Sequence, residues 1–138
     1  MHDREEMYIN GKWIKAKGTE KIKVINPSTE EIIGTIPVGN IEDMDYAIKS
    51  AKEAFTNWSK SEIEDRIEIL NSLSASLKDR SEEIAQIITS EVGTPIGYSR
   101  TAMVGTPKVV ARSYAKILET FEWEEEVRNS LIIKEAIG

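Results

Sequence analysis

The stretch Lys23–Gly39, KVINPSTEEIIGTIPVG, decides how the fold is interpreted. The β-branched residues before Asn26 and after Glu31 favour strands, and the residues between them favour a turn. Pro27 holds its own φ at about −65° and has no N–H group, so a regular strand ladder cannot continue through it. The stretch therefore predicts two short strands joined by a turn, within residues 21–38.

A second hairpin signal lies upstream, in the segment Tyr8–Ile14, YINGKWI. Asn10 and Gly11 both tolerate positive φ, and an Asn-Gly pair between apolar arms is the strongest short-range signal for a β-hairpin. We therefore expect a hairpin here, preceded by a disordered tail over residues 1–7. The remainder, residues 8–138, is expected to form one structural unit.

Downstream of these strands, apolar residues recur at helical spacing and predict a helix from Ile41 to Trp58. Asn40 is the expected N-cap of this helix, because its side chain accepts a hydrogen bond from a free N–H group of the first turn. Asp43 places a negative charge near the positive end of the helix dipole. Both signals favour a helix that begins directly after the second predicted strand.

Two further helices are predicted before residue 95. Ser61 and Glu64 have the spacing of a capping box, in which each side chain accepts a hydrogen bond from the other residue's N–H group. The third helix is expected to begin near Ser81 and to end at Gly93, which adopts the left-handed conformation that terminates many helices.

The last third of the chain gives a weaker pattern. Glycine and proline residues predict a kinked or broken helix that reaches about Thr120, with Thr106 as a local N-cap. Glu122–Arg128 is expected to be a charged loop. Leu131–Ile133 is expected to be a strand. Because this strand is followed only by the residues to Gly138, we expect the chain to stop partway through a larger fold.

Composition excludes several function classes. The formal net charge is −6, and the basic residues are scattered among carboxylates. Nucleic acid and anionic membrane surfaces are therefore not expected as partners. The sequence has no apolar run long enough to span a bilayer and no signal-peptide pattern at its N-terminus, so the cytoplasm is the expected location.

Catalytic chemistry is also restricted. The chain has no cysteine, which excludes a disulfide framework, a zinc–thiolate site and a cysteine nucleophile within these residues. The single histidine, His2, has no nearby candidate partner for metal binding. No glycine-rich nucleotide loop and no HExxH motif occurs. We therefore predict no catalytic and no cofactor-binding residue in this chain.

Taken in order, the segments YINGKWI, INPSTEEIIGTIPVG, AIKSAKEAFTNW and RIEILNSLSASLKDRSEEIAQIITSEVGTP resemble the N-terminal part of the NAD(P)-dependent aldehyde dehydrogenase superfamily. The resemblance runs from Tyr8 to about Pro95 and, more loosely, to Gly138. It implies an α/β fold in which N-terminal β-hairpin strands are followed by three to four amphipathic helices and a final strand. Such a chain is an incomplete doubly wound domain with additional strands for oligomerisation.

The resemblance also implies a function for the complete protein. A cysteine thiolate attacks an aldehyde, a hydride passes to NAD or NADP, and hydrolysis of the resulting thioester releases a carboxylic acid. In the family, the cysteine, the general base and the cofactor-binding fold lie beyond the N-terminal portion. The expected partners of the complete protein are therefore a small aldehyde and further copies of itself, and the 138-residue chain alone is expected to be inactive.

One binding site follows from the same resemblance. In several members of the family, a monovalent cation is held by main-chain oxygens before the NP turn and by a carboxylate before the glycine that ends the third helix. The matching positions here are Val24, Ile25 and Glu91. Glutamate stands where aspartate is common, so the longer side chain places its oxygens differently. The alternative is that Glu91 is solvated or paired with a lysine.

Two other classes of function remain open. The chain is alternatively a non-catalytic interaction module, because open strand edges and uncovered apolar helix faces favour association. It is otherwise a helical binding protein that resembles the family by chance. Coding DNA that continues into a βαβ pattern with a later cysteine would favour the enzyme, whereas a stop codon and a stable oligomer would favour the module.

Overall fold

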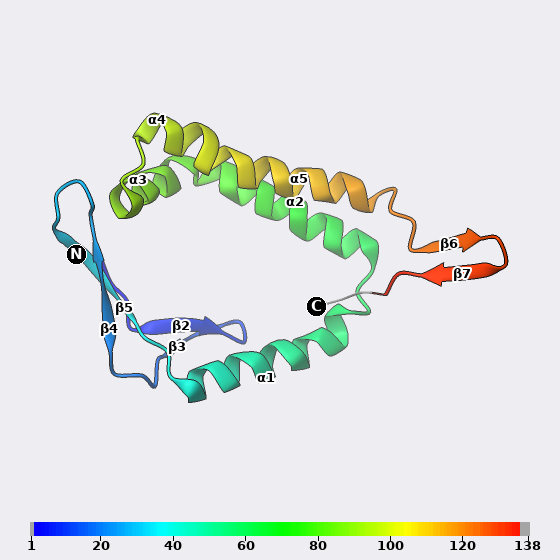
Figure 1. The fold of residues 1–138 in the computed structure, drawn as a ribbon, viewed down its shortest axis with the longest axis horizontal. Coiled ribbons are helices and arrows are strands. Elements are labelled where there is room, and N and C mark those ends of the chain that lie inside the picture. The colour runs from blue at the N-terminus through cyan, green and yellow to red at the C-terminus, as the bar shows by residue number, and fades with distance from the viewer. Residues whose placement is uncertain (1, 136–138) are drawn as a thin grey trace.

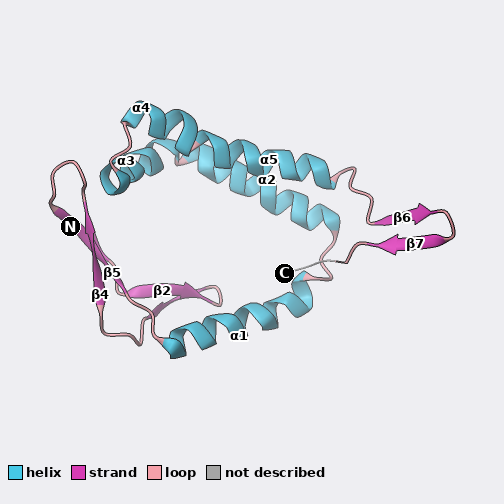
Figure 2. Cartoon of the chain, viewed as in Figure 1, coloured by secondary structure: helices cyan, strands magenta, loops and turns pink. Residues whose placement is uncertain are grey.

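The computed structural model describes residues 2–135, and Figure 2 shows strands at two ends of the molecule with helices between them. The strands are β1 (His2–Asp3), β2 (Glu6–Ile9), β3 (Lys12–Lys15), β4 (Lys21–Ile25), β5 (Ile32–Pro37), β6 (Glu124–Val127) and β7 (Ser130–Ile133). The helices are α1 (Ile41–Trp58), α2 (Ile63–Asp79), α3 (Ser81–Val92), α4 (Ile96–Tyr98), the π-helix η1 (Ser99–Met103) and α5 (Gly105–Leu118).

The upstream hairpin is confirmed. β2 and β3 pair antiparallel, and Tyr8 lies opposite Trp13 in the register. Asn10 and Gly11 form the turn with φ of 54° and 73°, which are the positive values that a two-residue hairpin turn requires. The two aromatic rings meet edge to face with their centroids 5.3 Å apart, a favoured arrangement for aromatic pairs.

The two strands predicted within residues 21–38 are also confirmed, and they belong to a three-stranded sheet with the order β1-β5-β4. β4 and β5 pair antiparallel. In the turn between them, Asn26 Oδ1 accepts a hydrogen bond of 2.9 Å from the Ser28 N–H group, and Asn26 N–H donates to the Glu31 carbonyl oxygen. The side chain of Asn26 therefore stabilises the turn that Pro27 begins.

Of residues 1–7, for which a disordered tail is expected, His2–Asp3 form β1 and residues 6 and 7 begin β2, with Arg4 and Glu5 between the two strands. β1 pairs parallel with β5, and the Arg4 N–H group donates to the Thr35 carbonyl oxygen at 2.9 Å. The Thr35 hydroxyl donates to Asp3 Oδ1 at 2.8 Å. The edge of β5 thus supplies hydrogen-bond partners for this segment. The charged residues of the segment do not indicate that such partners exist.

The predicted start of α1 is confirmed and that of α2 is wrong. Asn40 and Asp43 form a capping box at the start of α1. At α2 the N-cap residue is Glu62, which makes no side-chain cap hydrogen bond. The Ser61 hydroxyl donates instead to the Trp58 carbonyl oxygen at 2.8 Å and accepts a hydrogen bond from Arg66. Ser61 therefore closes the end of α1 rather than opening α2.

The helix break in the last third of the chain is confirmed. Gly93 ends α3 with φ of 76°, and the short helix α4 and the π-helix η1 precede α5. Thr106 is not the N-cap, because that position is Val104 and the backbone is already helical there. α5 packs alongside α2, as Figure 1 shows.

Glu122–Arg128 is not a loop throughout. Glu124–Val127 forms β6, which pairs antiparallel with β7. The expected strand at Leu131–Ile133 is confirmed as part of β7. Its ladder with β6 provides backbone hydrogen bonds that outweigh the weak strand preference of glutamate. Residues 136–138 lie outside the described residues.

Most apolar side chains of the described residues remain accessible to solvent. Within the part of the chain that the structure describes, the buried apolar core consists of four small residues, Ala85, Val104, Ala111 and Ala115. The molecule exposes 10807 Å², whereas a compact monomer of 15.5 kDa exposes about 7,200 Å². In Figure 1, α1 lies apart from the α2–α5 pair. No described helix is long and apolar enough to cross a membrane.

Candidate functional site

The predicted cation site falls where the C-terminal end of α3 meets the turn between β4 and β5. A Cβ atom added to Gly93 would lie 2.7 Å from Cγ of Pro27. The absence of a side chain at Gly93 therefore permits this close approach, and its φ of 76° favours glycine for a second reason. The two segments that carry the predicted ligands thus end in contact with one another.

Val24 and Ile25 lie at the last positions of β4, at an irregularity of the sheet. Val24 pairs with Gly34 and Ile25 pairs with Ile32, so Ile33 of β5 is an extra residue in the ladder. A β-bulge of this kind disrupts the regular ladder locally and re-aims the backbone. Val24 and Ile25 therefore lie where the β4–β5 ladder is irregular.

Glu91 lies in the last turn of α3, two residues before Gly93. Its side chain is exposed, and among residues 2–135 it takes part in none of the ion pairs. The C-terminal end of a helix carries partial negative charge, which favours a cation nearby. Within the described residues, no group of three or more His, Cys, Asp or Glu side chains is suited to a metal ion.

A second polar centre, which sequence reasoning only partly found, joins α1 to the loop after β3. The carboxylate of Asp43 is buried and accepts hydrogen bonds from the N–H groups of Asn40 (3.0 Å), Lys17 (3.0 Å) and Gly18 (3.2 Å). These bonds hold the pKa of Asp43 below its ordinary value of 3.8. Asp43 therefore caps α1 and also holds the loop that follows β3. The capping signal in the sequence does not indicate this second role.

A bidentate ion pair fastens η1 to α3. Arg100 Nε and Nη2 donate to the two carboxylate oxygens of Glu82 at 2.8 and 2.7 Å. Hydrogen bonds from Arg100 and Gln86 lower the pKa of Glu82 from 4.5 to about 2. Beneath this pair, the buried Ser99 hydroxyl lies 2.9 Å from the Thr89 hydroxyl. These contacts position the π-helix, and they include no nucleophile with an adjacent general base.

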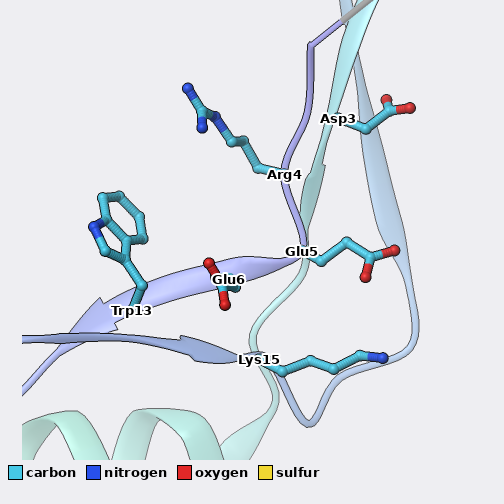
Figure 3. Close-up of a pocket in the computed structure, with 6 residues that line it drawn as sticks. All are labelled: Asp3, Arg4, Glu5, Glu6, Trp13 and Lys15. Atoms are coloured by element: carbon cyan, nitrogen blue, oxygen red, sulfur yellow. The ribbon is translucent and has the colours of Figure 1, made fainter.

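A polar pocket of about 450 Å³ lies beside the segment that joins β1 to β2 and is lined by Asp3, Arg4, Glu5, Glu6, Trp13 and Lys15. Figure 3 shows Arg4 and Trp13 to the left of the segment that joins β1 to β2, and Glu5 and Lys15 to its right. Glu5 is paired with Lys21 at 3.0 Å, which lowers the pKa of Glu5. The charged side chains of this pocket thus lie on opposite sides of the segment and do not converge on one reacting atom.

The described residues combine two N-terminal hairpins with three long helices and a broken helix. The sequence model of the Aldehyde dehydrogenase family matches residues 13–138. The chain therefore belongs to the aldehyde dehydrogenase family, and the fold corresponds to the N-terminal part of the family's structures, as the resemblance of its motifs implies.

Individual relatives agree with this assignment. A member of the family from Staphylococcus aureus is 36% identical over 140 residues, covering 100% of this chain and 29% of the relative. An aldehyde dehydrogenase from Bartonella henselae superposes with a TM-score of 0.90 at 30% identity, over 94% of this chain and 28% of that chain. A mutant of aldehyde dehydrogenase C from Pseudomonas syringae, complexed with NAD+ and octanal, superposes with a TM-score of 0.90 at 29% identity, over 94% and 27%. The chain thus spans less than a third of the length of these relatives.

Proposed function

We propose that the complete protein is an NAD- or NADP-dependent aldehyde dehydrogenase that oxidises a small aldehyde to a carboxylic acid through a cysteine thioester. The observation that carries this proposal is the fit of the described fold to solved aldehyde dehydrogenases, with a TM-score of 0.90 over 94% of the chain. One of the matching structures holds NAD+ and octanal. The nicotinamide cofactor would accept the hydride, and the thiolate and general base would come from other parts of the protein.

The role of this chain in that enzyme is structural. Its uncovered helix faces would pack against the cofactor-binding half, because removing large apolar side chains from water is favourable. The chain alone, which has no cysteine, is expected to be inactive. We further propose that the complete protein is a cytoplasmic homo-oligomer and that residues 8–138 form one unit of it.

The test begins with the coding DNA beyond Gly138 and proceeds to the protein that the complete reading frame encodes. We expect a βαβ pattern and a later cysteine, and aldehyde-dependent formation of NADH or NADPH by the complete product. The 138-residue chain, assayed under the same conditions, is the matched control and should give no turnover. Turnover by the purified 138-residue chain, or a complete frame without aldehyde oxidation, would contradict the proposal and favour a non-catalytic interaction module.

We also propose a monovalent cation site formed by the main-chain oxygens of Val24 and Ile25 and by the carboxylate of Glu91. Three observations support it: the irregular ladder between Val24 and Ile25, the close approach of Gly93 to Pro27 and the position of Glu91 at a helix C-terminus. A large ion of low charge suits a site of carbonyl oxygens with a single carboxylate.

A cation that binds only the folded chain raises its thermal midpoint. We expect the midpoint in potassium chloride to exceed that in tetramethylammonium chloride of equal ionic strength by about 3 °C. Glu91→Gln should remove this difference. Glu68→Gln, which makes the same change of charge at an exposed position on α2, should keep it. An equal difference in both variants would refute the site.

A further inference from the structure

A groove between α2 and α5 carries positive charge in a molecule that is acidic as a whole. It has a volume of about 520 Å³, within the range of small-molecule sites. The residues that line this α2–α5 groove are Asn71, Ser74, Ala75, Lys78, Lys108, Val109 and Arg112. Three of them are basic and none is acidic, although the net charge of the chain is −6.

The two helices hold these cations in a defined arrangement. The Ser74 hydroxyl of α2 donates to the Lys108 carbonyl oxygen of α5 at 3.0 Å, which fixes the two helices relative to each other at the groove. Lys108 and Arg112 are four residues apart and therefore lie on the same face of α5. Lys78 occupies the same face of α2 as Ser74, one turn further along.

Ordinary structural roles do not account for the whole cluster. Lys78 lies in the last turn of α2, where a cation complements the helix dipole. Lys108 and Arg112 are outside the last turn of α5, whose basic residue is Lys116. Within residues 2–135, none of the three groove cations takes part in an ion pair. The groove thus gathers positive charge that the described residues do not neutralise.

We propose that the α2–α5 groove binds a small phosphate-bearing molecule. Arg112 would hold two phosphate oxygens through its planar guanidinium, and Lys78 and Lys108 would add point charges from opposite sides. Ala75 and Val109 form an apolar surface for the body of the ligand. Asn71 supplies an amide that can donate to a further oxygen.

The test is a calorimetric titration of this chain with inorganic pyrophosphate at low ionic strength. We expect saturable binding that Arg112→Gln weakens about tenfold or more, because a charge-assisted bidentate contact is lost. Arg112→Lys, which keeps the charge but not the fork of donors, should weaken binding to a smaller extent. The matched control is Lys52→Gln, the same loss of one charge at an exposed position on α1, and it should bind as the wild type does.

Three outcomes would overturn the proposal. The first is the absence of saturable binding, and the second is an equal loss of affinity in Arg112→Gln and Lys52→Gln, which would indicate unspecific attraction to charge. The third is a change of oligomeric state in Arg112→Gln without an effect on pyrophosphate, which would assign the groove to carboxylates of a second copy. Circular dichroism of each variant checks that its helices are intact.

Discussion

Gly18→Ala is expected to lower the free energy of unfolding of this chain by about 3 kcal/mol. A Cβ atom at this position would overlap the carbonyl oxygen of Val38 and would lie 3.4 Å from the amide nitrogen of Asn40. Both neighbours are backbone atoms and cannot rotate away. The loop must therefore move, and its movement breaks the hydrogen bonds from Lys17 and Gly18 to the buried Asp43 carboxylate.

Urea unfolding of the variant and the wild type measures this effect. The matched control is Gly97→Ala, the same substitution at a helical position where an added Cβ meets nothing within 4 Å. This control should be stabilised by up to about 1 kcal/mol, because alanine favours helix more than glycine does. If Gly18→Ala were as stable as the wild type, the packing of the loop against Val38 would be wrong.

The predictions that the structure confirms depend on local chemistry. Asn10 and Gly11 form a hairpin turn because both accept positive φ, a property of the residues themselves. Asn40 caps α1 through an atom only three residues from its partner. Gly93 ends α3 because few other residues adopt its conformation. Such features are encoded within a few neighbouring residues and can be predicted from sequence.

The predictions that failed depend on partners distant in sequence or on competition between partners. His2–Asp3 forms a strand because β5, more than thirty residues away, supplies its hydrogen bonds. Glu124–Val127 resembles a solvated loop by composition and becomes a strand through pairing with β7. Ser61 has a choice of acceptors, and the end of α1 competes successfully for its hydroxyl. Local propensity does not decide such cases.

The candidate sites also depend on contacts between segments that are distant in sequence. The junction of Pro27 and Gly93 joins two segments that the sequence marks separately, and only the family resemblance connects them before the structure is known. The α2–α5 groove was not predicted, because it requires the packing of Ser74 against Lys108, which are 34 residues apart. Scattered basic residues in a sequence do not indicate which of them will line one groove.

The isolated chain is expected to associate with itself strongly. Its surface exceeds that of a compact monomer of the same mass by about 3,600 Å², an area comparable to that of large obligate interfaces. Many large apolar side chains are exposed, including Ile41 (81% exposed), Ile117 (50%) and Ile133 (61%). They lie on α1, α5 and β7, so no rearrangement of a single element covers them.

Sedimentation velocity of the purified chain over a range of concentrations tests most directly whether these surfaces were shaped to be covered by further structure. We expect a sedimentation coefficient that rises with concentration as apolar faces of different copies pair. A strictly monomeric and compact species at high concentration would contradict it, because such a species would have covered those side chains from within.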